Sequence, residues 1–345
     1  MEEHSARPAL LGLEGLTLEE RRPATAGIQW ASTIGRRGWR LPLDSRFRGN
    51  DVRGAMLKSL IRRGVRSLGY DILKVPRAAP LSTATSPPPI EPIWPLPRAG
   101  RATSDAWLRD AFAAFPHWHY AYAFEDGLTF STAHVNPGPE TDDPVRPLQR
   151  FRHFIPQLVA AAGGSLRGKR VLDMACNSGF WSIQCALMGA EVVGFDARPE
   201  LVAQANLLKE ATRAASAEFR RLDFADASAA TLGGTFDIVL NLGLLYHLPE
   251  PLSALERTVR LSHGHVLLDT GIHPADDHLV YLKWEEPFDI RMAASQGIVA
   301  VPTGRAIDLM LRHLGVRSSL RVPVRSADIP DVYRTERRAS WLIEV

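Results

Sequence analysis

Short hydrophobic runs alternate with amphipathic stretches through the second half of the chain. Five runs are predicted strands, at 170–175, 190–196, 217–223, 236–242 and 265–271. Between them, apolar residues recur at helical spacing, and helices are expected to begin near Phe180, Pro199, Ser228 and Pro251. A last helix at 303–314 and two late strands at 319–325 and 339–345 complete the pattern. Such alternation predicts a parallel sheet with helices on both faces.

The first 165 residues lack this alternation. Residues 1–55 show no sustained period and are expected to be disordered, or a misassigned leader ahead of a start at Met56. Residues 56–100 predict a basic amphipathic helix and a Pro-rich linker; the helix either packs on its own domain or contacts an anionic membrane surface. Residues 101–165 are expected to form a cap with two helices and an aromatic cluster, and 166–345 the main domain.

Composition narrows the class of protein. The 345 residues are 45% hydrophobic and 23% charged, which is typical of a soluble globular chain. No apolar run is long enough for a membrane-spanning helix, so stable membrane insertion is not expected. The net charge of +3 gives no sign of a surface that coats nucleic acid. Only Cys176 and Cys185 are present, which excludes a disulfide framework and favours a reducing, cytoplasmic compartment.

One motif carries the strongest chemical signal. In VLDMACNSGFWS, Asp173 ends a strand and a turn closing at Gly179 enters a helix, while Asp196 ends the next strand. Such a turn directs backbone N–H groups at a ligand, and the second carboxylate can accept both hydrogen bonds of a ribose diol. An adenosine-containing cofactor is therefore predicted. The turn lacks the glycines of G-x-G-x-x-G, which disfavours a dinucleotide and a nicotinamide-dependent oxidoreductase.

This segment resembles motif I of the class I S-adenosylmethionine-dependent methyltransferases. Ala175 and Asn177 stand at the first two glycine positions of that motif, and asparagine tolerates positive φ better than most residues. The resemblance extends over about 165–345. It implies a Rossmann-like α/β sandwich with a mostly parallel seven-stranded sheet, an antiparallel last strand pair and an N-terminal helical and aromatic cap. The implied cofactor is S-adenosyl-L-methionine.

The same resemblance implies a set of cofactor contacts. They are Asp173, Ala175, Asn177, Gly179, Asp196, Asp223, Phe224, Asn241 and Gly243. A narrower resemblance is to methyltransferase-like relatives of the tRNA wobble-uridine (carboxy)methyltransferase. It is carried by FPHWHYAYAFEDGL, by GLLYHL and by the late stretches VPTGRAIDLMLRHLGV and YRTERRASWLIEV. It implies that Trp118 and Tyr246 contact the substrate.

Methyl transfer needs few dedicated catalytic groups, because the donor is already activated and the protein chiefly positions the nucleophile and removes a proton. His247, just past the fourth predicted strand, is the first candidate base, and His119 is the second. Simpler interpretations remain open: the two aspartates as helix caps, Tyr246 and His247 as packed residues, and the aromatic run as core. No metal is expected, because the histidines lack ligand-spaced partners.

The acceptor is not fixed by these motifs. A nearly balanced charge favours a small molecule or a glycan over nucleic acid. A tRNA substrate of the wobble-uridine type, with a carboxylated cofactor, is one alternative. Another is a non-catalytic binding protein that keeps the fold with a weakened cofactor turn, as Ala175 and Asn177 suggest. The sequence sets no oligomeric state.

Overall fold

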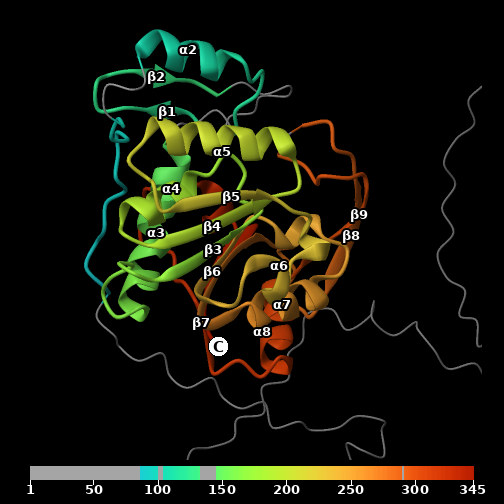
Figure 1. The fold of residues 1–345 in the computed structure, drawn as a ribbon. Helices are drawn as coiled ribbons and strands as arrows, with labels where there is room; N and C mark the ends of the chain where they lie inside the picture. Colours follow the sequence, from blue (N-terminus) through green and yellow to red (C-terminus); the bar gives the residue numbers. More distant parts are fainter. Residues whose placement is uncertain (1–85, 100–103, 133–144, 290) are drawn as a thin grey trace, which may run out of the picture. The chain divides into compact units, whose positions relative to one another are not determined.

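The computed structural model describes residues 86–99, 104–132, 145–289 and 291–345 (Figure 1). The chain divides into two compact units after Ser82, and every described residue belongs to the second, Thr83–Val345. The expected leader at 1–55 and the basic helix that follows it lie outside the described residues.

A seven-stranded sheet forms the centre of this unit. Its strands are β3 (Arg170–Met174), β4 (Glu191–Asp196), β5 (Ala217–Arg221), β6 (Phe236–Leu242), β7 (Ser262–Gly271), β10 (Ser318–Arg321) and β11 (Arg338–Glu344). Their order is β10-β11-β7-β6-β3-β4-β5. Neighbours from β5 to β7 pair in parallel, whereas β11 is antiparallel to both β7 and β10. The predicted fold class, with its antiparallel last pair, is confirmed.

Helices cover both faces of the sheet. They are α3 (Arg146–Ala161), α4 (Phe180–Leu187) and α5 (Pro199–Ala211) on one face, and α6 (Ala229–Leu232), α7 (Pro251–Arg260) and α8 (Gly304–His313) on the other. Successive strand residues serve opposite faces, as the two-residue period of a strand requires. Val171 thus packs in the first core and Leu172 in the second. Burial on both faces explains why the strands are continuous apolar runs.

The segment before the sheet forms the predicted helical and aromatic cap. It contains α2 (Asp105–Ala113), β1 (Tyr122–Ala123) and β2 (Thr129–Phe130). Ser104 caps α2 by accepting a hydrogen bond from the Trp107 amide at 3.1 Å. The aromatic side chains of the cap belong to the same hydrophobic core as α4 and α5. The cap therefore packs directly on the face of the main sheet that carries α4.

The described part of the Pro-rich segment, residues 86–99, is pinned to this face. The Gln184 side chain of α4 accepts from the Ile93 amide at 2.9 Å and donates to the Ile93 carbonyl at 3.0 Å. The Leu96 amide donates to the Ala123 carbonyl of β1 at 2.8 Å. These bonds satisfy the backbone of a segment whose prolines prevent regular structure.

A hairpin outside the main sheet has no counterpart among the predicted elements. It consists of β8 (Val280–Glu285) and β9 (Gly297–Pro302), paired antiparallel. The remaining short helices are η2 (Phe224–Asp226), η3 (Leu245–His247) and α9 (Asp331–Arg334). No helix in the described ranges has the length and apolarity needed to cross a membrane.

Candidate active site

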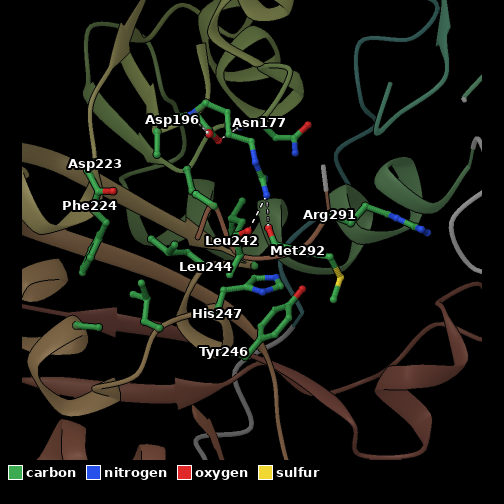
Figure 2. Close-up of a pocket in the computed structure, with 18 of the residues that line it drawn as sticks. Asn177, Asp196, Asp223, Phe224, Leu242, Leu244, Tyr246, His247, Arg291 and Met292 are labelled. Carbon is green, nitrogen blue, oxygen red and sulfur yellow. Dashed lines mark hydrogen bonds between the residues drawn. The ribbon is translucent and has the colours of Figure 1, made fainter. Parts of the chain in front are cut away.

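A cavity of about 850 Å³ lies at the carboxyl ends of β4 and β6. Asn177 and Asp196 lie on one side of it, and Tyr246 and His247 on the other (Figure 2). This is the edge at which open parallel sheets bind ligands. The volume falls within the range of small-molecule sites, and the wall combines apolar side chains with a few charged groups.

The turn after β3 has the left-handed backbone angles that favour glycine, although alanine and asparagine occupy its first two such positions. Ala175, Asn177 and Gly179 have φ angles of 50°, 54° and 86°. The Asn177 side chain supports the turn, because its Oδ1 accepts from the Ser178 amide at 2.7 Å. At Gly179 a Cβ atom would lie 3.0 Å from Ala205 Cβ, so this glycine is needed for packing as well as for its backbone angle.

Asp196 lies at the end of β4, in the cavity wall. Its Oδ2 accepts from the Asn177 amide at 3.0 Å, and its Oδ1 accepts from the Arg198 amide at 3.1 Å. Burial raises its pKa, and these two backbone bonds oppose the rise. Each carboxylate oxygen keeps acceptor capacity for a further donor, which suits the two hydroxyls of a ribose.

A second part of the wall follows β5. Asp223 caps η2, since its Oδ1 accepts from the Ala225 amide at 2.8 Å, and Phe224 lies beside it in the cavity wall. Arg257 lies over the Phe224 ring at 5.5 Å from its centroid. Leu222 and Leu244 also line the cavity, so an aromatic ring would find apolar faces and one carboxylate here.

Tyr246 and His247, in η3, form the opposite wall. His247 Nδ1 lies 2.5 Å from Oε2 of Glu285, the last residue of β8. Glu285 Oε2 also accepts from the Ala293 amide at 2.9 Å, and its Oε1 accepts from Lys283 at 2.8 Å. Burial lowers the pKa of His247, but the Tyr246 phenol and the Glu285 carboxylate outweigh it, so the net pKa is raised. A carboxylate on Nδ1 leaves Nε2 as the nitrogen that can exchange a proton.

The Tyr246 phenol has an unusual environment. Burial raises its pKa, but His247 and the Arg338 guanidinium lower it to about 7. Its ring packs against Gly271, where an added Cβ would lie 3.3 Å from the ring. The phenol therefore ionises readily next to the imidazole of His247.

Behind Tyr246, a buried carboxylate joins three elements. Asp269 Oδ1 in β7 accepts from Arg150 Nη2 of α3 at 2.7 Å and from Arg338 Nη2 of β11 at 2.5 Å. Its Oδ2 accepts from the hydroxyls of Tyr333 and Ser340, at 2.6 and 2.7 Å. Although burial raises the pKa of Asp269, the two arginines and the hydroxyl donors hold it well below its usual value.

The loop between β8 and β9 closes part of the cavity. Arg198 Nη2 donates to the carbonyls of Met292 and Ala293, each at 2.8 Å. Because the Arg198 amide also donates to Asp196, Arg198 connects the Asp196 carboxylate to this loop. Met292 and Ala293 both line the cavity.

Not every predicted site residue reaches the cavity. Among the predicted site residues, those that line the cavity are His119, Ala175, Asn177, Asp196, Asp223, Phe224, Gly243, Tyr246 and His247. Asp173 and Asn241 lie beneath the wall: Asp173 accepts from Ser182 Oγ at 2.6 Å, and Asn241 donates to Thr258 Oγ1 at 3.1 Å. Burial raises the pKa of Asp173 to about 7. Gly179 shapes the turn from behind.

Trp118 lies in the cap core instead of the cavity wall. Its ring stacks on Phe112 at 4.3 Å, and its Nε1 donates to the Phe112 carbonyl at 3.1 Å. The expectation that Trp118 contacts the substrate is therefore corrected. Its indole N–H finds its acceptor within the cap core, as the N–H of a buried indole usually does. His119, its neighbour, does line the cavity.

Several lining residues carry charge that the sequence motifs did not single out: Arg146, Arg150, Arg198, Arg291 and Arg338. Glu285, which bonds to His247 from outside the lining, was not singled out either. Glu285 is 38 residues from its histidine, and Arg338 lies within the late stretch YRTERRASWLIEV, where no residue was assigned a role. Only Arg198 had a local signal, its position directly after the strand that ends at Asp196.

Comparison with known proteins agrees with this geometry. Residues 148–317 match the family described as a methyltransferase domain. The structure of the N-terminal domain of EvdMO1 with SAH bound has the same fold, with a TM-score of 0.52 and 22% identity, over 71% of this chain and 98% of that one. Residues 148–317 thus match a methyltransferase domain, and the chain shares the Rossmann-like methyltransferase fold.

Two curated relatives are O-methyltransferases. The ubiquinone biosynthesis O-methyltransferase of Acinetobacter baylyi is 30% identical over 127 residues, which are 36% of this chain and 53% of that protein. The enzyme of the same name from Pseudomonas putida is 37% identical over 99 residues, 28% of this chain and 41% of that protein. The chain therefore spans about half the length of the curated relatives it matches.

The residues of the cavity fit S-adenosylmethionine. The Asp196 oxygens can accept from a ribose, the apolar wall around Phe224 suits an adenine ring, and Asp223 keeps one oxygen for its amino group. The left-handed backbone at Ala175 and Asn177 brings the main chain to the cavity wall, as an amino-acid tail requires.

Proposed function

We propose that the protein transfers the methyl group of S-adenosylmethionine to a hydroxyl oxygen of a small molecule, with His247 as the base. The observation that carries this proposal is the 2.5 Å contact between His247 Nδ1 and Glu285, at the wall opposite Asp196. A hydroxyl is a weak nucleophile until its proton is removed, and an oriented imidazole performs this step.

One set of residues would bind the cofactor, and another would remove the proton of the acceptor hydroxyl. Asp196, Asp223 and Phe224 would hold the cofactor, which supplies a methyl group on a positively charged sulfur. Glu285 fixes the His247 ring through Nδ1, so that Nε2 takes the proton of the acceptor hydroxyl. Tyr246 lies beside the imidazole at 4.1 Å between ring centroids and stabilises its charged form. Holding the acceptor oxygen in line with the methyl group would supply the rest of the rate enhancement.

The cavity and the relatives both support a small acceptor. A volume of about 850 Å³ has room for the cofactor and a molecule of one or two rings. The relatives named above are O-methyltransferases, which agrees with a base beside the acceptor position. A sugar hydroxyl lies within this proposal. The wobble-uridine alternative gains no support from these relatives.

The test is label transfer from tritiated S-adenosylmethionine to a panel of phenols, catechols and monosaccharides by the full chain. We expect product with at least one hydroxyl acceptor. His247→Gln should lower kcat by about 10²–10⁴-fold, the range for loss of a general base, while S-adenosylhomocysteine still binds. His313→Gln is the matched control, because His313 is an exposed histidine that does not line the cavity.

Two results would count against the proposal. One is full activity of His247→Gln, which would remove the base from the mechanism. The other is no label in any hydroxyl compound of the panel from a protein that binds S-adenosylhomocysteine, which would remove the hydroxyl acceptor.

A further inference from the structure

The β8–β9 hairpin has an unpaired edge. β8 pairs with β9 along one side, and no strand within the described residues pairs with its other side. β9 is the strand attached to the main body, because the Ala300 amide donates to the Leu248 carbonyl at 2.9 Å. β8 is therefore the outer strand of the hairpin, at one side of the molecule (Figure 1). The backbone N–H and C=O groups of such an edge can pair with a further strand.

Apolar side chains project from both faces of β8. Leu282 is 58% exposed and Trp284 61% exposed on one face, and Tyr281 is 53% exposed on the other. Ile298, directly opposite Trp284 in β9, is exposed as well. A solvated face of a sheet normally carries polar residues. Exposure on both faces indicates a partner that approaches β8 along its edge, because the side chains of an added strand cover both faces at once.

The size of this patch suits an interface between proteins. Of the twelve large apolar residues exposed in the part of the chain that the structure describes, seven lie within 279–298. Tyr281, Trp284 and Phe288 each expose more than half of their surface. An aromatic residue can bury about 150–250 Å², so the patch is on the order of several hundred Å², near the roughly 800 Å² that each partner contributes to a standard interface. Contiguous apolar patches of this size mark interaction sites.

The charges beside the patch argue against a membrane as the partner. Asp277 precedes β8, Glu286 follows it, and both are exposed. Anionic lipid headgroups repel carboxylates and attract clusters of lysine and arginine. Lys283 is the one cation within β8, and it pairs with Glu285 at 2.8 Å. The strand therefore has no cationic cluster that would hold it on a lipid surface.

A second copy of β8 matches this edge when the two-fold axis lies at Leu282. Antiparallel pairing then places Leu282 opposite its own copy and Val280 opposite Trp284. Tyr281 lies opposite Lys283, which allows a cation–π contact. An axis at Lys283 would instead place two ammonium groups directly opposite each other, which is destabilising. The sequence of β8 thus favours the register centred on Leu282.

We propose that two copies of the chain associate by antiparallel pairing of their β8 strands, which joins the two hairpins into one four-stranded sheet. This inference does not rest on the proposed function. It does concern the same site, because β8 ends at Glu285, the residue that bonds to His247. Pairing at the outer edge holds the strand that presents this carboxylate.

The first experiment is sedimentation equilibrium of the full chain. We expect a monomer–dimer equilibrium in the wild type and a Kd raised at least about tenfold in Leu282→Lys, because two ammonium groups then lie opposite each other at the axis. Leu309→Lys is the matched control, since it makes the same change at a leucine of α8 that is also exposed. A wild type that stays monomeric up to about 100 μM, or equal Kd values for the wild type and Leu282→Lys, would overturn the proposal.

A charge pair then tests the register and separates it from damage to the fold. Leu282→Lys and Leu282→Glu should each form weaker homodimers, whereas an equimolar mixture of the two should form heterodimers, because opposite charges meet at the axis. Circular dichroism checks that both variants are folded. A mixture of folded variants that associates no better than either one alone would contradict the register.

Cross-linking gives an independent measurement of the same contact. Directly opposite residues in an antiparallel pair have Cα atoms about 4.5–5.5 Å apart, within reach of a disulfide. Leu282→Cys should therefore form a disulfide-linked dimer under mild oxidation, and Leu309→Cys, the control for random collision, should form far less. The natural cysteines, Cys176 and Cys185, are both buried. Equal yields from the two variants would count against pairing at β8.

Vesicle flotation tests the membrane alternative. The wild type is mixed with vesicles of phosphatidylglycerol and phosphatidylcholine, and we expect it to stay in the aqueous fraction. A monomeric chain that floats with the vesicles, and no longer does so as Leu282→Lys, would assign the patch to lipid and overturn the proposal.

Discussion

Asn177 shows how one residue can replace a glycine at a cofactor turn. Its φ of 54° lies in the left-handed region, where most side chains are strained and asparagine is tolerated. Its Oδ1 accepts from the Ser178 amide, and its own amide donates to Asp196. The sequence predicted this substitution from the motif alone; the two hydrogen bonds that support it depend on the folded turn.

If the turn is already in its binding shape, Asn177→Gly should not tighten cofactor binding. The backbone conformation is available to both residues, so we expect the Kd for S-adenosylhomocysteine to stay within about twofold, far below a 1.4 kcal/mol effect. Calorimetric titration of both proteins measures this. A gain of tenfold or more would favour the alternative of a binding protein with a weakened turn.

Other residue roles show where sequence reasoning stops. His247 was predicted because it follows a strand that ends at the binding edge. Its partner Glu285 was not, because 38 residues separate them and only the fold brings them together. Trp118 was misplaced because a buried aromatic core and an aromatic pocket give the same sequence pattern.

At the scale of elements, the five parallel strands and their helices were predictable because each is a continuous apolar run or an amphipathic repeat. The β8–β9 hairpin was not. Leu282 and Trp284 of β8 are exposed, so β8 lacks the buried apolar face that makes a strand recognisable, although β9 buries Val299 and Ala300. Nevertheless the hairpin carries Glu285 at its end and delivers the carboxylate to His247.

This connection predicts a shift in the pH profile. The Glu285 carboxylate stabilises the charged imidazole and raises the pKa of His247, so the wild-type base is neutral only at higher pH. In Glu285→Gln that pKa falls, and the acidic limb of kcat/KM against pH should move to lower pH while the plateau decreases through loss of orientation. Rates from pH 5 to 9 with the best acceptor of the panel test this. An unmoved limb would separate Glu285 from the titrating group.

On the scale of the whole molecule, Asp269 joins α3, β7 and β11 through one buried carboxylate. The network connects α3, which precedes the sheet in the chain, to β11, the last strand of the chain. Through Arg338, which lies next to the Tyr246 ring, it also supports Tyr246. No motif marks Asp269, and its partners lie 119 and 69 residues away in the chain. Such long-range charge networks follow from topology and cannot be read from local patterns.

Asp269→Asn should destabilise the fold by about 3–5 kcal/mol, because it leaves two buried guanidinium groups without their anion. The native pKa of Asp269 is depressed, so its contribution is fully present above the unfolded pKa of about 4, begins to decrease below it, and is lost as pH falls through the depressed native pKa. Urea unfolding at pH 7 and at pH 3.5 should therefore show a smaller gap between variant and wild type at the lower pH. Equal gaps would contradict the electrostatic origin.

We expect the cavity between Asp196 and His247 to bind S-adenosylmethionine. The most direct test of this expectation is calorimetric titration of S-adenosylhomocysteine into the full chain, its Asp196→Ala variant and the control Glu200→Ala, an exposed acid four residues further along. We expect saturable binding to the wild type and the control, and a loss of about 1.5–3 kcal/mol of binding free energy in a folded Asp196→Ala variant. Equal binding by all three proteins, or none by the folded wild type, would contradict it.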